Sequence, residues 1–76
     1  MTISEVKKYL SDLIGHITFE YNSYSCGVDP ITLNSFDMWY GDNVITVNSI
    51  DEVINNNFFD GKSLKDIFDD ITELEF

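Results

Sequence analysis

Residues 35–48, with the sequence SFDMWYGDNVITVN, decide the fold because they contain the pattern of a β-hairpin. Side chains alternate between apolar and polar over residues 35–40, and that period of two is typical of a strand with one buried face. Residues 41–43 mark a tight turn, after which residues 44–48 continue as a second strand. One face of the first strand carries Phe36, Met38 and Tyr40, and the other carries Ser35, Asp37 and Trp39.

The register of this hairpin depends on which two residues form the turn. A turn at Gly41-Asp42 pairs Met38 with Ile45, whereas a turn at Asp42-Asn43 pairs Tyr40 with Ile45. Both turns keep the apolar residues of the two strands on a common face, and a three-residue loop would mix polar with apolar side chains. The sequence therefore determines the buried face and leaves the register open.

The N-terminal residues have the pattern of an amphipathic helix. Thr2 and Glu5 have the spacing of a capping box, in which each satisfies a free backbone N–H of the other. An apolar stripe at helical spacing follows, formed by Ile3, Val6, Leu10, Leu13 and Ile14. We therefore expect a helix over residues 3–14 that ends in a left-handed cap at Gly15.

Between this helix and the hairpin we expect one strand and one loop. Residues 17–21 alternate apolar with polar, which predicts a half-buried strand. Residues 22–30 are rich in turn formers and end at Pro30, which cannot donate a backbone hydrogen bond. This segment is therefore predicted to be a loop, and it could fold over Trp39.

Two further helices are expected after the hairpin. Ser49 and Glu52 have capping-box spacing and begin a short helix over residues 50–54. Ser63 has the position of an N-cap for a last helix, in which Leu64, Ile67, Phe68, Ile71 and Leu74 form the apolar stripe. The outer face of that helix would carry Asp66, Asp69, Asp70 and Glu73.

These elements predict one α+β domain that spans residues 1–76. It is a small two-layer domain in which a three-stranded antiparallel sheet, a meander, packs its apolar face against the helices. The expected order is helix, strand, strand, strand, helix, helix. Helices cover one side of such a sheet, so the opposite side is left open or meets a partner. That side would present His16, Glu20, Asp37 and Trp39.

Composition excludes several classes of function. The 76 residues include 14 acids, 4 bases and one histidine, for a net charge of −10. Because phosphate binding depends on clustered lysine and arginine, we expect no direct binding to nucleic acid and none to a membrane. A single cysteine, Cys26, allows no internal disulfide, and no leader or long apolar run occurs, so a cytoplasmic location is expected. Amino acids that are encoded by AT-rich codons are abundant, which favours a low-GC bacterium or its phage as the source.

Known catalytic and metal-binding patterns are incomplete in this sequence. Asp60-Gly61-Lys62-Ser63 resembles the end of a phosphate-binding loop, but the motif's first glycine is replaced by Asn56. Cys26 and His16 are too few for a zinc site, and nothing in the sequence pairs them as nucleophile and base. No calcium-loop pattern occurs either. We therefore expect no cofactor, no metal and no enzymatic activity.

The remaining signals favour a protein that binds another protein. Trp39, flanked across the hairpin by Val44 or Thr46 according to the register, is typical of a contact residue on an open sheet face. The leading hypothesis is an interaction or regulatory module that binds a protein partner or itself. The alternative is a nucleic-acid mimic that inhibits a basic DNA- or RNA-binding protein. Candidate contact residues are Trp39, Val44, Glu20, Asp37, Asp66, Asp69, Asp70 and Glu73.

Overall fold

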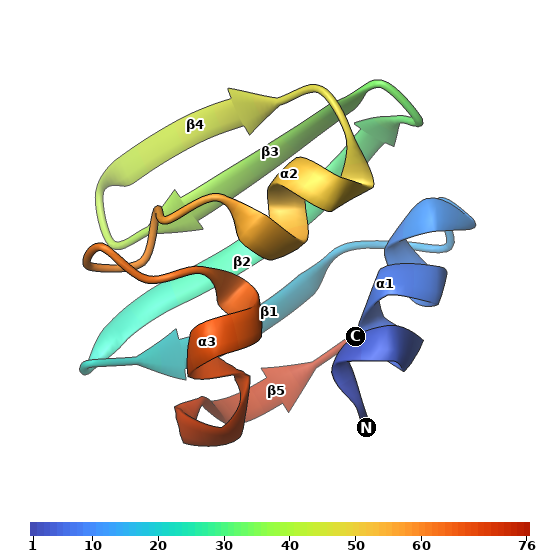
Figure 1. The fold of residues 1–76 in the computed structure, drawn as a ribbon. Helices are drawn as coiled ribbons and strands as arrows, with labels where there is room; N and C mark the ends of the chain where they lie inside the picture. The colour runs from blue at the N-terminus through green and yellow to red at the C-terminus, as the bar shows by residue number, and fades with distance from the viewer.

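The computed structural model describes residues 1–76 as two layers, with one antiparallel sheet and helices on one of its faces (Figure 1). The sheet has five strands in the order β4-β3-β2-β1-β5. The elements are α1 (Ile3–Ser11), β1 (Ile17–Tyr21), β2 (Tyr24–Thr32), β3 (Ser35–Tyr40), β4 (Asn43–Val47), α2 (Ile50–Asn55), α3 (Leu64–Ile67), η1 (Phe68–Asp70) and β5 (Thr72–Glu75). The predicted α+β class is confirmed, whereas the three-stranded sheet and the helix order are wrong.

The β3–β4 hairpin adopts the first of the two predicted registers. Tyr40 pairs with Asn43 and Met38 with Ile45, so Gly41 and Asp42 form the turn. Gly41 has a φ of +59°, which a type II′ turn requires at its first central position. The apolar face of this hairpin lies toward the helices, because Phe36, Met38 and Val47 are buried.

The segment predicted to be a loop is the central strand β2. It begins after a two-residue turn in which Asn22 and Ser23 both have positive φ, as a type I′ hairpin turn requires. Tyr24 therefore pairs with Tyr21, and β2 continues between β1 and β3. Cys26, expected in a loop, is buried in the core.

Pro30 fits into β2 because it lies beyond the end of β1. The β1–β2 pairing stops at Ile17 and Val28, so Pro30 has only β3 beside it. The Gly41 N–H donates to the Ser25 carbonyl at 2.9 Å, and odd-numbered residues of β2 therefore bond to β3. The missing N–H of Pro30 faces the unpaired side, where proline is tolerated.

The long last helix is also absent. α3 spans Leu64–Ile67, a 3₁₀ turn follows, and residues 72–75 form β5, which pairs with β1. Glu73 has a φ of +57°, and the β1–β5 register shifts beside it, which marks a bulge. The extra residue of a bulge reverses which face the following side chains point to, so Ile71 and Leu74 both pack against the core although they are three residues apart. That spacing is also typical of a helix, which is why a helix was predicted.

The first helix is shorter than predicted. α1 ends at Ser11, and Leu13, with a φ of 54°, takes the left-handed conformation expected of Gly15. The capping box of Thr2 and Glu5 is confirmed, because each side chain accepts a hydrogen bond from the other residue's backbone N–H. Leu13 and Ile14 are consequently exposed instead of buried.

The core lies between the sheet and the helices. It contains fourteen buried apolar residues: Val6, Leu10, Ile17, Phe19, Cys26, Val28, Phe36, Met38, Val47, Val53, Ile54, Phe59, Leu64 and Ile67. Each helix contributes side chains to it, and the sheet contributes one face of β1, β2, β3 and β4. The opposite face of the sheet has no helix over it (Figure 1).

Candidate functional site

The candidate site is the sheet surface that points away from the helices, called the outer face. Residues paired directly across strands point to the same side, so the register defines this surface. One row across the sheet runs Glu75, Thr18, Gly27, Trp39 and Val44. A second row runs Asp29, Asp37 and Thr46, and Glu20 pairs with Ser25 in a third.

Trp39 lies flat against the backbone of β2 at Gly27. A Cβ atom added to Gly27 would lie 2.1 Å from Cζ2 of the Trp39 ring, so any other residue at this position would push the ring aside. Gly27 is buried, whereas Trp39 remains half-buried. The segment expected to fold over Trp39 as a loop therefore lies under the ring as a strand.

Carboxylates surround this tryptophan. Trp39 borders a hollow of about 250 Å³ that Glu20, Glu73 and Glu75 also line. On its other side, Asp37 accepts a hydrogen bond from the Thr46 hydroxyl at 2.7 Å. These acids come from three different strands, and the sheet register brings them together around one aromatic ring.

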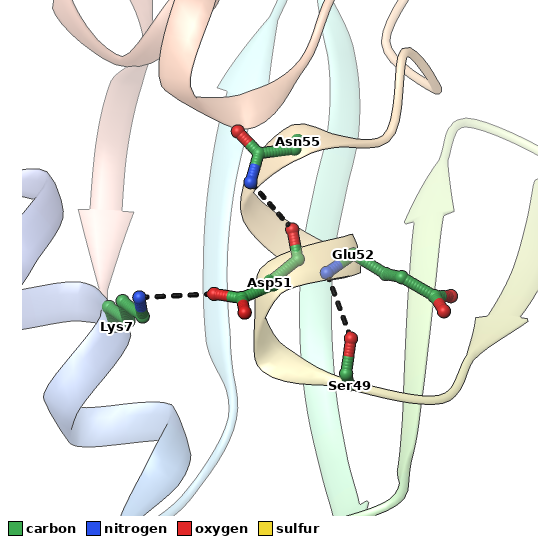
Figure 2. A network of polar contacts seen from close by, with 5 residues as sticks. All are labelled: Lys7, Ser49, Asp51, Glu52 and Asn55. Atoms are coloured by element: carbon green, nitrogen blue, oxygen red, sulfur yellow. Dashed lines mark hydrogen bonds and ion pairs between the residues drawn. The ribbon is translucent and has the colours of Figure 1, made fainter.

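None of the four lysines is in a strand: Lys7 and Lys8 lie in α1, Lys65 lies in α3, and Lys62 lies in the connection between α2 and α3. Lys7 of α1 forms an ion pair with Asp51 of α2 at 3.1 Å, and Figure 2 shows this contact next to the Ser49–Glu52 cap. Lys8 pairs with Asp12 at 2.9 Å. Two of the four lysines thus pair with acids in the helical layer, and no strand contributes a lysine that would offset the acids of the outer face.

The predicted contact residues divide into two groups. Trp39, Val44, Glu20 and Asp37 share the outer face as predicted, and Glu73 joins them through β5 instead of a helix. Asp66 caps α3, with its carboxylate accepting from the Ser63 N–H at 3.3 Å. Asp69 and Asp70 lie in the 3₁₀ turn. The continuous acidic helix face is therefore wrong.

The sequence reasoning missed Gly27, Asp29 and Glu75 as outer-face residues. For Gly27 and Asp29 the alternation typical of a strand was present in the sequence, because Tyr24, Cys26 and Val28 alternate with Ser25, Gly27 and Asp29. The turn formers and Pro30 obscured that alternation. Glu75 directly follows Leu74, the last residue of the predicted helix stripe, and lies in β5 opposite Thr18.

Cys26 and His16 lie in different surroundings. The Cys26 thiol is buried and donates to the Tyr24 carbonyl at 3.5 Å, and burial raises the pKa of this thiol to about 11. His16 is exposed just before β1. A thiol with such a raised pKa is a poor nucleophile at neutral pH, because the thiolate is the reactive form.

A second hollow, of about 650 Å³, lies where three turns meet. It is lined by Asn22, Tyr24, Tyr40, Asp42, Asn43 and Asp60. The Tyr24 and Tyr40 rings stack edge to face with their centroids 5.0 Å apart, and the Asn22 amide donates to the Tyr40 hydroxyl at 3.3 Å. No group of three or more His, Cys, Asp or Glu side chains is placed to hold a metal ion.

Fold and site together define a small α+β domain whose five-stranded antiparallel sheet presents an acidic, tryptophan-bearing face. Comparison of the chain with protein-family models, curated proteins and solved structures finds no match. None of its helices combines the length and the apolar character that crossing a membrane requires.

Proposed function

We propose that this chain is a non-enzymatic interaction module that binds a basic protein partner through the outer face of its sheet. The observation that carries the proposal is Trp39, seated on Gly27 and surrounded by carboxylates on a surface without lysine. Tryptophan is among the residues that contribute most to protein interfaces when a partner buries it. Surrounding charge of one sign selects a partner of the opposite sign and accelerates its association.

The shape of the outer face supports a protein partner over a small ligand. The hollow beside Trp39 measures about 250 Å³, and small-molecule sites span roughly 300–1,000 Å³. Exposed Val44 extends the apolar surface next to Trp39. A broad surface with an aromatic centre and a charged rim has the composition of a protein interface.

The second candidate function is mimicry of a nucleic acid. The predicted helix that would have displayed regularly spaced acids is absent, so this candidate now depends on the outer face. Asp29 and Asp37 pair directly across β2 and β3, where like charges repel, and a basic groove would relieve that repulsion. A nucleic-acid-binding protein is therefore one class of basic partner that fits the proposal.

Comparative capture from the native host tests the proposed function. The immobilised wild-type protein, Trp39→Ala and the double variant Glu20→Gln with Asp37→Asn are exposed to the same lysate. We expect basic proteins that bind the wild type, dissociate as salt rises to about 0.5 M, and are lost with both variants.

A matched control changes the same number of charges outside the outer face. Asp69→Asn with Asp70→Asn should capture the same proteins as the wild type, because both residues lie in the 3₁₀ turn. Circular dichroism verifies that each variant is folded. Equal capture by the wild type and by both outer-face variants would overturn the proposal.

A further inference from the structure

The two edges of the sheet differ in a way that indicates how a partner binds. The β5 edge is four residues long, carries Glu73 and Glu75 and contains the bulge at Glu73. Bulges and charges are common means of preventing another strand from pairing at an edge. The β4 edge, Asn43–Val47, has no charge, no proline and no bulge, and its last four residues are all β-branched.

The backbone of β4 presents unpaired hydrogen-bonding groups to solvent. The hydrogen bond from the Gly41 N–H to the Ser25 carbonyl fixes which residues of β3 face β2, and the other residues of β3 face β4. Asn43, Ile45 and Val47 are the residues paired with that second set. The N–H and C=O groups of Val44 and Thr46 therefore point away from the sheet. Both residues are exposed, Val44 by 64%.

The side chains beside this edge specify the chemistry of an added strand. Val44 and Thr46 lie on the outer face, opposite Trp39 and Asp37 respectively. The hydrogen bond from the Thr46 hydroxyl holds the Asp37 carboxylate toward β4. A strand paired with β4 would place one side chain next to Val44 and another next to Thr46, within reach of that carboxylate.

We propose that the β4 edge takes an extended segment of a basic partner by antiparallel strand addition. In this register a lysine or arginine lies opposite Thr46, and an apolar residue two positions later lies opposite Val44. Main-chain hydrogen bonds to Val44 and Thr46 hold the segment, and the two side chains select it. The basic character of the segment rests on the proposed function, whereas the strand pairing rests on the edge alone.

The probe is a blocked heptapeptide, acetyl-Lys-Val-Arg-Val-Leu-Val-Lys-amide, with arginine for the place opposite Thr46 and leucine for the place opposite Val44. Amide NMR of the full chain should show saturable binding that slows hydrogen exchange at Val44 and Thr46. N-methylation of the leucine should weaken binding about tenfold or more, because its N–H would bond to β4. N-methylation of the central valine is the matched control. It should change the affinity less than about twofold, because the N–H of that valine points away from β4.

Two further changes test the pairing and the charge separately. Val44→Pro removes an N–H that the hairpin does not use, whereas Val44→Ala keeps it, so the first should lose binding and the second should retain most of it. Replacing the peptide's arginine with glutamate should weaken binding about tenfold. If Val44→Pro fails to fold, the binding of the N-methylated peptides to the wild-type protein still tests the strand pairing.

The outcomes separate this inference from the proposed function. No saturable binding of the parent peptide, or equal binding of the two N-methylated peptides, would overturn strand addition. If the peptide binds regardless of N-methylation and Trp39→Ala abolishes its binding, strand addition is wrong and the outer face still binds a basic ligand. If N-methylation of the leucine alone abolishes binding and the change of arginine to glutamate has no effect, strand addition stands and the basic character of the partner is wrong.

Discussion

The contact between Gly27 and Trp39 is the most constrained feature of the outer face at the residue scale. Because an added Cβ would overlap the ring, Gly27→Ala must displace Trp39. We expect a red-shifted tryptophan emission and a free energy of unfolding lower by about 1–3 kcal/mol. Gly15→Ala is the control, since its Cβ would lie 2.9 Å from the Tyr9 hydroxyl, the far end of a flexible side chain that can move aside without disturbing Trp39. Unchanged emission in Gly27→Ala would contradict the described contact.

Cys26 should be almost unreactive in the folded protein. Its pKa of about 11, against a usual 9.0, leaves about 100-fold less thiolate at pH 8. Alkylation by iodoacetamide at pH 8 should therefore be at least about 100-fold slower in buffer than in 8 M urea. Mass spectrometry over time measures both rates, and similar rates in the two conditions would show that the thiol is accessible.

The same shift predicts a loss of stability in alkali. A raised pKa means that folding favours the protonated thiol, so this contribution is complete below pH 9 and is lost as the pH rises toward 11. Urea unfolding at pH 8 and pH 11 should show a smaller decrease for Cys26→Ala than for the wild type. An equal decrease in both proteins would assign the effect to other groups.

At the element scale, α3 depends on its cap. Four residues are too short for a stable helix in isolation, and Ser63 is buried while its hydroxyl accepts from the Asp66 N–H at 3.2 Å. Ser63→Ala should lower the free energy of unfolding by about 1–2 kcal/mol, measured in urea. The exposed Ser4 of α1 provides the control, and Ser4→Ala should change stability by less than about 0.5 kcal/mol. Equal losses of stability in Ser63→Ala and Ser4→Ala would show that the lost cap is not what destabilises Ser63→Ala.

The elements that sequence patterns predicted well are those in which local signals agree. The β3–β4 hairpin has alternation and a glycine turn together, and the capping box of Thr2 and Glu5 lies where the spacing placed it. The second predicted box is only half formed: Ser49 accepts from the Glu52 N–H, but the Glu52 carboxylate accepts from the Asn48 N–H. β2 was missed because Pro30 is normally a sign against an internal strand. It is tolerated here only because β1 ends before reaching it, which is a tertiary fact.

The C-terminal error has a different physical origin. Ile67, Ile71 and Leu74 have helical spacing, and an ideal strand would place Ile71 and Leu74 on opposite faces. The bulge at Glu73 adds one residue to the strand, so a bulged strand and a helix both place Ile71 and Leu74 against the core. Of the candidate site, Trp39, Val44, Glu20 and Asp37 were placed correctly, because the alternation of β1, β3 and β4 alone determines their face.

Charge acts at the scale of the whole molecule. With a net charge of −10 and only two ion pairs, repulsion among the acids opposes the compact state. Added NaCl screens that repulsion, so the melting temperature should rise between 20 mM and 500 mM salt, as measured by calorimetry. An equal osmolarity of glucose controls for solvent effects. A melting temperature independent of salt would show that the acids are too far apart to interact.

The pairing of β5 with β1 has a consequence for the order of folding. The other four strands join neighbours along the chain through short turns, whereas β5 must return from the opposite end of the sequence to meet β1. Closing so long a loop is slow, so the four-stranded meander should form first and β5 should attach last. The same strand would then be the first to detach from the folded protein, leaving the outer face around Trp39 without Glu73 and Glu75.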